Sequence, residues 1–389
     1  MSLPASEPLA RDEQSLSAAR WGTRTQFFCS GFLFATWGVH IPTVKAHYAI
    51  SEGALGLALL AAGIGALLGL SRAGVLVGRF GARGVALICG LLAALVLGLL
   101  LGLPGYPGLL AALAVFGATS SVFDVAINAE ASEIERRQGY PIMSHFHAMF
   151  SLGGMAGAAA GSLLLGWQVG AVTHLVGAAL AGALAIGWAC LQMLPPQPAA
   201  GDEPGFRLPR GVLLLLGVLA ALGLISEGAM YDWSVLYLQK ELGSPQDVAA
   251  LAYASFSGAM AAARFGGDWV RARTSPVMLM RASASLSALA MAAVLLVGHP
   301  VVALVGFALV GIGLGNVVPV LFSAAARVPG TTPAHGIAAV SSVGYLGFMA
   351  GPPLIGGLAQ GSSLTAALFV VVLFAAVLAA LSRRALPAG

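Results

Sequence analysis

Two apolar segments within residues 117–154 contain side chains that can bind protons or polar solutes, namely Asp124, Asn128, His145 and His147. A carboxylate at the centre of a lipid-spanning helix costs about 3 kcal/mol, so a chain retains one there chiefly where it has a use. A carboxylic acid in an apolar surrounding favours its neutral form and can take and release a proton, and histidine titrates in the physiological range. We therefore expect proton exchange and hydrogen bonding to a polar solute in this stretch.

Spacing indicates which of these side chains share a helical face. Asp124 and Asn128 are four residues apart, as are His147 and Ser151, and each pair therefore lies on one face of a helix. His145 points away from His147 by about 200° of helix rotation, so we expect only His147 in the site. The alternatives are a structural pairing of Asp124 with another helix and a neutral His147 that donates to a backbone carbonyl.

Other apolar segments carry further polar and aromatic side chains. Glu227 and Tyr231 share a helical face, which makes Glu227 a second candidate for proton exchange. Asp232 lies nearer the end of the same segment, where we expect water to reach it. The other side chains predicted to contact a solute are Trp37, His40, Asn316 and Tyr345. As single polar residues, Asn316 and Tyr345 also suit a role in joining helices.

The composition indicates that lipid surrounds these segments. Of the 389 residues, 58% are hydrophobic and 9% are charged, against about 25% charged residues in an average soluble domain. The cysteines lie far apart in apolar runs and predict neither a disulfide nor a metal site: Cys29, Cys89 and Cys190. The spacing of His145 and His147 does not suit a metal either. The first twenty residues are polar, so we expect no cleaved signal peptide.

Apolar runs of about 20 residues can cross a bilayer as helices, and the sequence contains twelve such runs. They are residues 22–44, 53–72, 84–103, 108–129, 142–166, 168–194, 211–239, 247–267, 275–297, 300–325, 333–358 and 363–382. Continuous apolar runs lack the alternation of a membrane β-barrel. The predicted fold class is therefore an all-α membrane protein with twelve transmembrane helices.

Basic residues predict the orientation of these helices, because cytoplasmic loops of membrane proteins are rich in lysine and arginine. With twelve crossings and a cytoplasmic N-terminus, every arginine falls on the cytoplasmic side, and the lysines Lys45 and Lys240 fall outside. Both termini are then cytoplasmic, and the predicted location is a bacterial inner membrane. Because the basic residues flank lipid in this arrangement, the net charge of +4 does not indicate a nucleic-acid partner.

The two halves of the chain resemble each other. Leu-Gly-Gly-Met-Ala-Gly at residues 152–157 recurs as Leu-Gly-Phe-Met-Ala-Gly at residues 346–351. Prolines and mixed charges indicate a linker between the halves. Parallel six-helix repeats are one layout of secondary transporters, which hold a solute between the repeats. The predicted organisation is a cytoplasmic tail (1–20), an N-terminal six-helix bundle (21–194), a cytoplasmic linker (195–210) and a C-terminal six-helix bundle (211–389).

Residues 20–385 resemble the major facilitator superfamily. The stretch 74–83, Gly-Val-Leu-Val-Gly-Arg-Phe-Gly-Ala-Arg, is similar to the family's loop 2–3 signature, with Gly78 in place of the usual aspartate. Asp124-Val-Ala-Ile-Asn128 resembles an element on helix 4 of fucose-permease-like sugar–proton symporters. Residues 37–43 lack the second acid that fucose permeases carry at the end of helix 1. The likeness extends to bacterial inner-membrane transporters without an assigned substrate.

The resemblance implies proton-coupled transport of a small polar, sugar-like solute by alternating access between two pseudo-symmetric bundles. It implies a monomer whose partners are the solute, protons and membrane lipid, and no cofactor. Proton coupling would fall to Asp124 and Glu227. The solute would be bound by Asn128, His147, Trp37, His40, Ser151, Tyr231, Asn316 and Tyr345.

Proton-driven efflux of drugs or metabolites is the alternative, although residues 153–157 lack the Gly-Pro element typical of antiporters on helix 5. A transporter-like sensor is a third possibility, but such proteins usually carry an added signalling domain. No phosphate-cradling loop is present to bind ATP, and no motif indicates an enzyme.

Charged residues near the predicted cytoplasmic ends of facing helices suggest a gate. Opposite charges there are Arg79, Glu133, Arg264 and Asp268. Exposed charges of this kind are usually only solvated. We nevertheless expect them to form salt bridges between the halves that close the cytoplasmic side in the outward-open state.

Overall fold

The computed structural model describes residues 6–139, 142–195, 210–331 and 333–386, and all regular structure in these ranges is helical. A first group of helices contains α1 (Ser6–His47), α2 (Glu52–Leu99), α3 (Gly105–Gln138), α4 (Met143–Gly166) and α5 (Ala171–Gln192). A second group contains α6 (Val212–Lys240), α7 (Gln246–Arg271), α8 (Pro276–Val297), α9 (Pro300–Leu314), α10 (Val317–Ala325), α11 (Pro333–Gly361) and α12 (Leu364–Ala385). Most of the predicted linker lies outside the described residues.

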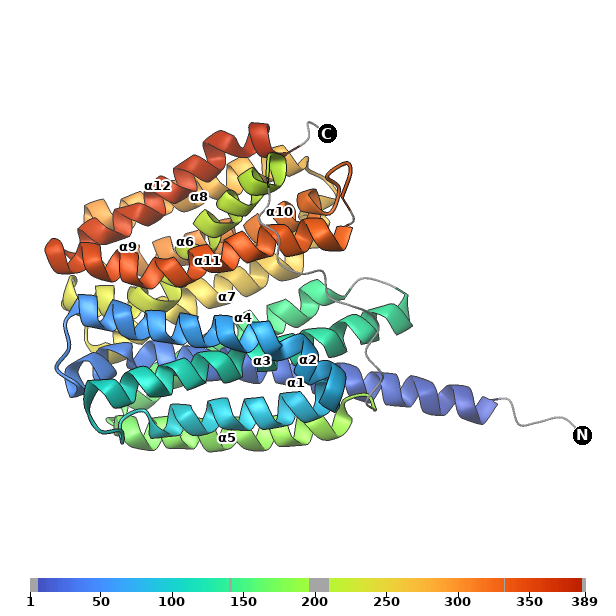
Figure 1. Ribbon diagram of the computed structural model, residues 1–389. Helices are drawn as coiled ribbons and strands as arrows, with labels where there is room; N and C mark the ends of the chain where they lie inside the picture. Colours follow the sequence, from blue (N-terminus) through green and yellow to red (C-terminus); the bar gives the residue numbers. More distant parts are fainter. Residues whose placement is uncertain (1–5, 140–141, 196–209, 332, 387–389) are drawn as a thin grey trace, which may run out of the picture.

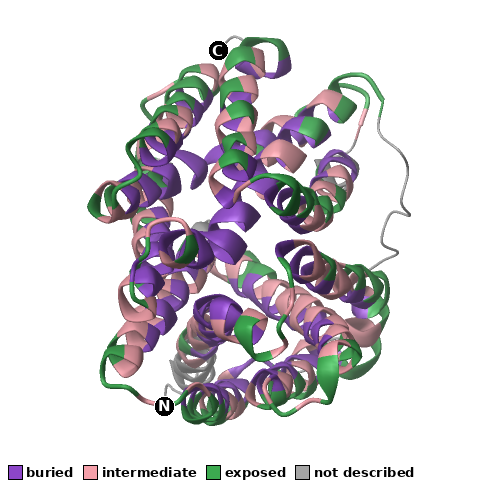
Figure 2. Cartoon of the chain, turned by 90° about the vertical axis from the view of Figure 1, so that its left-hand side faces the viewer, coloured by how far each residue is buried: buried purple, intermediate pink, exposed green. Residues whose placement is uncertain are grey.

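The two groups lie one above the other in Figure 1, with their helices running roughly along the same direction. Both termini lie toward the same end of the bundle, which we call the terminal end; the other is the distal end. The groups contact each other through α2 with α11, α4 with α7 and α1 with α6. Figure 2 views the distal end, where buried residues concentrate at the meeting of the two groups.

Helix length supports a membrane-spanning bundle. Ten helices in the described ranges are long and apolar enough to cross a bilayer. One of them, α2, contains 48 residues, or about 72 Å at 1.5 Å per residue, which is twice what a crossing of roughly 30 Å requires. Gly81 interrupts α2 with a φ of 76° and a ψ of 153°, so α2 supplies two of the predicted crossings.

The stretch between residues 72 and 84 was expected to be a loop, and it is helical except at Gly81. Its Ala, Leu and Arg residues favour helix, and only glycine adopts such a positive φ easily. In the run 300–325, by contrast, the structure has a break where we expected continuous helix. We expected one helix there, and the structure has α9 and α10 with a break at Gly315 and Asn316.

Serine and glycine residues fix several helix ends. Ser51, Ser275 and Ser363 precede α2, α8 and α12, and each hydroxyl oxygen accepts a hydrogen bond from a backbone N–H of the first turn. This is the N-cap role for which serine is favoured. Gly139 and Gly298 end α3 and α8 with φ values of 74° and 62°, a left-handed conformation that costs glycine little.

Close backbone contact joins α1 to α4 in the first group. A Cβ atom on Gly31 would lie 1.9 Å from the Phe150 carbonyl oxygen, and one on Gly153 would lie 2.0 Å from the Phe28 carbonyl oxygen. Small residues permit this approach in membranes, where dispersion contacts rather than the hydrophobic effect join helices. The segment 152–157, one copy of the glycine-rich repeat, thus lies in the interface between α1 and α4. This packing fixes the position of the polar residues on α4.

Candidate functional site

Arg264 lies inside the bundle, where it connects the two helix groups. Its guanidinium donates to Ser151 Oγ of α4 at 2.9 Å and to Glu227 Oε1 of α6 at 3.1 Å. The Arg264 and Glu227 side chains are only 15% and 11% exposed. Our expectation that Arg264 lies at the rim is therefore wrong. The residue precedes the end of α7 by about two helical turns, and pairing with Glu227 offsets the cost of burying its charge.

Tyr231 and Ser257 extend the contacts around Glu227 and Ser151. The Tyr231 hydroxyl donates to Glu227 Oε1 at 3.4 Å, and the Ser257 hydroxyl donates to the Ser151 carbonyl at 2.8 Å. The Tyr231 ring lies edge-on to Phe34 of α1, with the ring centroids 5.9 Å apart. The structure therefore brings together three residues predicted to bind protons or solute and Arg264, which was predicted for the gate. We call the connected polar set the interior network: Ser151, Glu227, Tyr231, Ser257 and Arg264.

His147 lies beside the interior network. Its ring is edge-on to Phe27 of α1, with the ring centroids 5.3 Å apart, and the Arg264 charge is within electrostatic range. We expected His147 in the same site as Asp124, but no hydrogen bond or ring contact between described residues joins the two side chains. The reason is packing, because α4 lies mainly against α1 and α7. His145 is exposed on another face, near Phe265.

Asp124 and Asn128 lie together on α3, as their spacing predicts. The Asn128 amide donates to the Asp124 backbone carbonyl at 2.8 Å, and both side chains are half-buried. Among the described residues, no ion pair holds the Asp124 carboxylate. Tyr345 of α11 is 45% exposed and lies within electrostatic range of Asp124 and Glu227. The two carboxylates therefore belong to different groups, and only Glu227 is paired with a cation.

Three residues predicted to contact solute are enclosed by helix packing. Trp37 is 3% exposed. His40 is fully buried, and its Nε2 lies 2.8 Å from Nδ1 of His174 on α5. Asn316 stands at the break between α9 and α10, and its amide donates to the Ala263 carbonyl at 3.4 Å. Polar contacts of this kind join membrane helices, which is the alternative that the sequence left open for Asn316.

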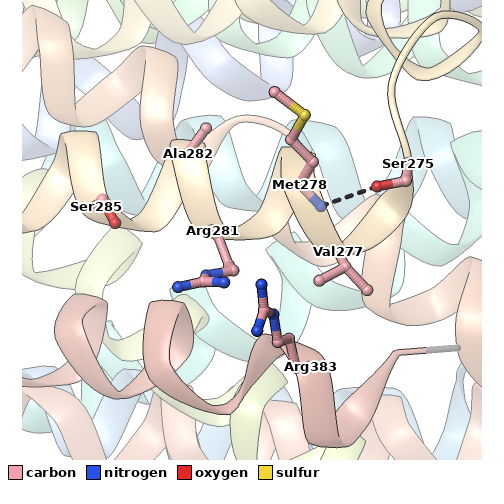
Figure 3. A pocket seen from close by; sticks show the side chains of 7 residues that line it. All are labelled: Ser275, Val277, Met278, Arg281, Ala282, Ser285 and Arg383. Atoms are coloured by element: carbon pink, nitrogen blue, oxygen red, sulfur yellow. Dashed lines mark hydrogen bonds between the residues drawn. The ribbon is translucent and has the colours of Figure 1, made fainter. Parts of the chain in front are cut away.

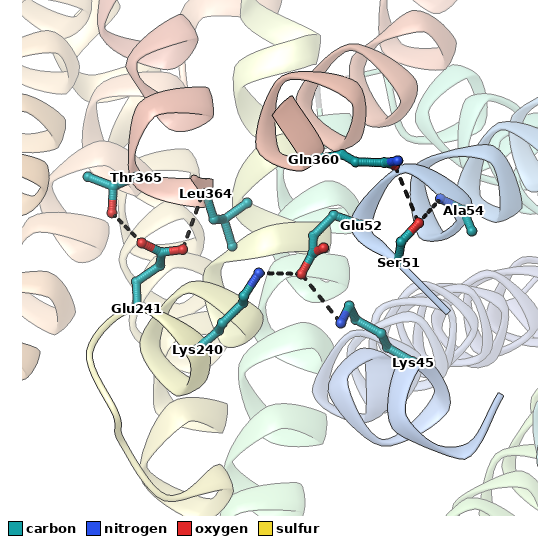
Figure 4. Close-up of polar contacts among 9 residues, drawn as sticks. All are labelled: Lys45, Ser51, Glu52, Ala54, Lys240, Glu241, Gln360, Leu364 and Thr365. Carbon is teal, nitrogen blue, oxygen red and sulfur yellow. Dashed lines mark hydrogen bonds and ion pairs between the residues drawn. The ribbon is translucent and has the colours of Figure 1, made fainter. Parts of the chain in front are cut away.

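A second polar cluster joins the groups at the distal end. Glu52, at the start of α2, forms ion pairs with Lys45 of α1 at 3.3 Å and with Lys240 at the end of α6 (Figure 4). The amide of Gln246, at the start of α7, donates to Thr43 Oγ1 at 2.7 Å. We call these five residues the distal gate. The sequence analysis used both lysines only to predict the orientation of the helices. It did not single out Glu52, which starts α2 within reach of both lysines.

At the terminal end, the predicted gate residues make local contacts. Glu133 forms ion pairs with Arg136 at 2.6 Å and with Arg137 at 2.7 Å, all on α3. The Arg79 guanidinium lies 5.2 Å from the ring centroid of its neighbour Phe80. The Asp268 side chain is outside the described residues. A salt bridge between the groups at this end is therefore still a prediction, and it concerns the opposite conformational state.

Asp232 is buried, although its place near the end of the segment led us to expect hydration. It is 7% exposed, and every residue of α6 from 225 to 238 is buried. The cause is that α6 packs against helices on several sides, including α1 of the first group. Asp232 is therefore a further carboxylate buried in the bundle, as is Glu130 of α3, which is 4% exposed.

The described residues offer no metal site, since no group of three or more His, Cys, Asp or Glu side chains is arranged to hold an ion. The three cysteines are free thiols, and the Gln26 amide donates to Sγ of Cys190 at 3.0 Å. The side chains of the interior network can instead exchange hydrogen bonds and protons.

The sequence profile of the Major Facilitator Superfamily matches residues 25–335. The chain belongs to the Major Facilitator Superfamily. An uncharacterized MFS-type transporter of Yersinia pestis is 34% identical over 362 residues, covering 93% of this chain and 94% of that protein. The membrane protein MosC of Rhizobium meliloti is 32% identical over 366 residues, covering 92% and 88% of the two chains. The chain is thus a secondary transporter and not an enzyme, as the sequence predicted.

Solved superfamily structures share the fold of this transporter. A bacterial homologue of the human lysosomal transporter Spinster, in an inward-facing conformation, has a TM-score of 0.76 at 13% identity and covers 95% of this chain and 97% of that one. A D-xylose–proton symporter has a TM-score of 0.74 at 12% identity, with 95% and 98% covered. Identities this low indicate the fold alone. The prediction of an all-α membrane protein with the superfamily fold is confirmed.

Proposed function

We propose that this superfamily member carries a small polar, sugar-like solute into the cell together with protons. The observation that supports this most strongly is the contrast between two of the acids inside the bundle: among the described residues, Asp124 of the first group has no cation, whereas Glu227 of the second group is paired with Arg264. Acids inside membrane segments typically belong to proton or ion pathways. Because the two acids face different charge environments, they suit different tasks.

Asp124 is the proposed proton carrier. A carboxylate without a cation is costly to keep charged at low dielectric, which favours proton binding where water can reach it. Asp124 is half-buried rather than sealed, which permits that access. Asn128, one turn further along α3, has an amide that can hydrogen-bond to the carboxyl group in either protonation state or to a solute hydroxyl.

Glu227 and Arg264 are the proposed link between solute binding and the movement of the groups. Arg264 holds Ser151 of the first group and Glu227 of the second group simultaneously. A solute oxygen that accepts from Arg264 competes with Ser151 for the guanidinium, which weakens the contact between the groups and allows α4 and α7 to separate. A ligand shifts a conformational equilibrium only by its difference in affinity for the two states. A solute that must displace Ser151 from Arg264 would bind more tightly to the state in which that contact is already broken.

The proposed solute carries several hydroxyl groups. Asn128, Ser151 and Tyr231 can donate to and accept from hydroxyls, and the half-exposed Tyr345 adds an aromatic ring. His147, next to the interior network, supplies one more ring nitrogen. Two solved structures with the same fold are a D-xylose–proton symporter and a nucleoside transporter. Both solutes named there are polyhydroxylated, which agrees with a sugar-like solute here.

The closed distal gate suggests the direction in which the cavity opens. Lys240 and Gln246 hold the second group against the first at the distal end. We propose that the distal end is the outer side, that both termini are cytoplasmic, and that this is an inward-facing state in a bacterial inner membrane. Alternating access then requires the distal gate to open while the terminal end closes.

Efflux of drugs or metabolites is the second candidate. The aromatic contacts of Phe34, Tyr231 and Tyr253 near the interior network would suit a flat apolar compound as well as a sugar ring. A resistance assay in an efflux-deficient host separates the two candidates. Resistance that depends on Asp124 would favour efflux, whereas unchanged sensitivity combined with solute accumulation favours uptake.

Reconstituted protein tests the proposed function directly. A thermal-shift screen of sugars, nucleosides, amino acids and cationic drugs identifies a solute, because a ligand stabilises the state that it binds. Uptake of that solute into proteoliposomes is then measured with and without an inward proton gradient. We expect accumulation only with the gradient. Equal uptake under both conditions would contradict proton coupling.

A further inference from the structure

We propose that the terminal end of the second group binds the phosphate of an anionic phospholipid between α8 and α12. A pocket of about 530 Å³ opens there, and its volume lies within the roughly 300–1,000 Å³ of small-molecule sites. The residues that line it are Ser275, Val277, Met278, Arg281, Ala282, Ser285 and Arg383. Figure 3 shows Arg281 from α8 and Arg383 from α12 turned toward each other across this pocket.

The two arginines face each other without a counter-charge. Among the described residues, no carboxylate forms an ion pair with Arg281 or Arg383. Two like charges that converge repel each other, and an anion between them converts that repulsion into attraction. A phosphate is well suited because the guanidinium fork donates two parallel hydrogen bonds to its oxygens. The pocket therefore favours a phosphate group over a neutral ligand.

The start of α8 adds to the attraction. Ser275 caps the helix by accepting from the Met278 N–H at 3.2 Å, and Pro276 follows at its first position. The N-terminus of a helix carries a partial positive charge that favours anions. This contribution supports the arginine pair but would not define a site alone.

The surroundings indicate a lipid rather than a soluble phosphate. From the pocket, an exposed stripe continues along α8 toward the distal end through positions at helical spacing, namely Ser285, Leu289, Ala293 and Leu296. The matching stripe on α12 comprises Leu373, Ala376, Ala380 and Arg383. Beyond the pocket these surfaces are apolar, with Leu289 72% and Leu373 59% exposed. A headgroup phosphate between the arginines would place its acyl chains against these stripes, as basic pockets between membrane helices do with anionic lipids.

Native mass spectrometry of the purified full chain tests this site. Phosphatidylglycerol, phosphatidylcholine with the same chains and inorganic phosphate are titrated separately against the wild type, Arg281→Gln/Arg383→Gln and Arg384→Gln. Arg384 is the matched control, since it is an exposed arginine next to Arg383 that does not line the pocket. We expect the double variant to bind phosphatidylglycerol about tenfold more weakly, and the control to match the wild type.

A second variant keeps both charges and removes the space. Ser285→Trp fills the pocket from α8 and should weaken phosphatidylglycerol binding similarly, while the melting temperature without lipid stays unchanged. Equal phosphatidylglycerol binding by the wild type and the double variant would overturn the proposal. So would an equal loss in Arg384→Gln, which would indicate unspecific attraction. Inorganic phosphate that binds as tightly as phosphatidylglycerol would refute the lipid assignment.

Discussion

At the scale of single residues, Glu227 and Asp124 of this transporter differ in their partners. Glu227 shares Arg264 with Ser151 and receives the Tyr231 hydroxyl, whereas Asp124 has no cation among the described residues. An ionised carboxylate at low dielectric is stabilised by a neighbouring cation and is costly to bury without one. We therefore assign proton carriage to Asp124 and the link between the groups to Glu227.

Removing one member of the interior ion pair should destabilise the protein more than removing both. Arg264→Gln leaves Glu227 as a buried charge without its partner, a change that costs about 3–5 kcal/mol where pairs are buried. Arg264→Gln/Glu227→Gln leaves no charge and should recover most of the lost melting temperature. Thermal unfolding of the four proteins of this double-mutant cycle measures the coupling. Additive losses in the cycle would show that the pair contributes nothing.

Sequence reasoning succeeded for residues whose neighbours lie on the same helix. The spacing placed Asp124 with Asn128 and Glu227 with Tyr231 on shared helical faces. In the structure the Asn128 amide donates to the Asp124 backbone carbonyl, and the Tyr231 hydroxyl donates to the Glu227 carboxylate. Sequence reasoning failed where a contact crosses between helices. The contacts of His147 depend on how α4 is rotated against α1 and α7. The length and direction of the Arg264 side chain place its guanidinium in the interior instead of at the terminal end. Neither quantity is encoded in spacing along one segment.

At the scale of helices, glycine determines both packing and breaks. Gly31 and Gly153 bring α1 against α4, and Gly81 divides α2 into two crossings. Twelve crossings could be predicted, because each needs only about 20 apolar residues. The helical connection within α2 and the gap between α9 and α10 could not, because both depend on local backbone angles within apolar sequence.

Adding a methyl group at the α1–α4 contact should destabilise the protein. Gly31→Ala places Cβ against the Phe150 carbonyl, and overpacking of this kind costs about 1–3 kcal/mol. Gly177→Ala is the matched control, because a Cβ on this α5 glycine has no neighbour within 4 Å. We expect a lower melting temperature in detergent for the first variant and no loss for the second. Equal melting of both would mean that α1 and α4 separate freely.

At the scale of the whole molecule, charged contacts hold the two groups together at different depths. The distal gate joins them through Glu52 and Lys240, and the interior network joins them through Arg264 and Ser151. Alternating access requires both connections to be broken and remade in each cycle. The distal gate is the more exposed of the two, with the Lys240 side chain 45% exposed, so it should open at a lower cost.

Loss of the Glu52 charge should shift the transporter toward an outward-open state. Glu52→Gln removes the acceptor shared by Lys45 and Lys240. We expect labelling by an impermeant maleimide of a cysteine placed at Ser257, which is buried against Ser151 of the first group, to rise several-fold. Charge exchange in Glu52→Lys/Lys240→Glu should lower labelling relative to Glu52→Lys alone, since it restores opposite charges between the groups. Labelling that is the same in all variants would contradict a gate at the distal end.

The most direct test of the proposed mechanism is solute-driven proton movement through Asp124→Asn. The solute from the thermal-shift screen is added outside proteoliposomes that contain a pH indicator, and uptake driven by a proton gradient is compared with exchange of solute at equal pH. We predict that the wild type acidifies the lumen when solute enters. Asp124→Asn should abolish acidification and gradient-driven accumulation, while exchange at equal pH persists because solute binding remains. Acidification by Asp124→Asn at the wild-type rate would contradict the assignment of Asp124 as the proton carrier.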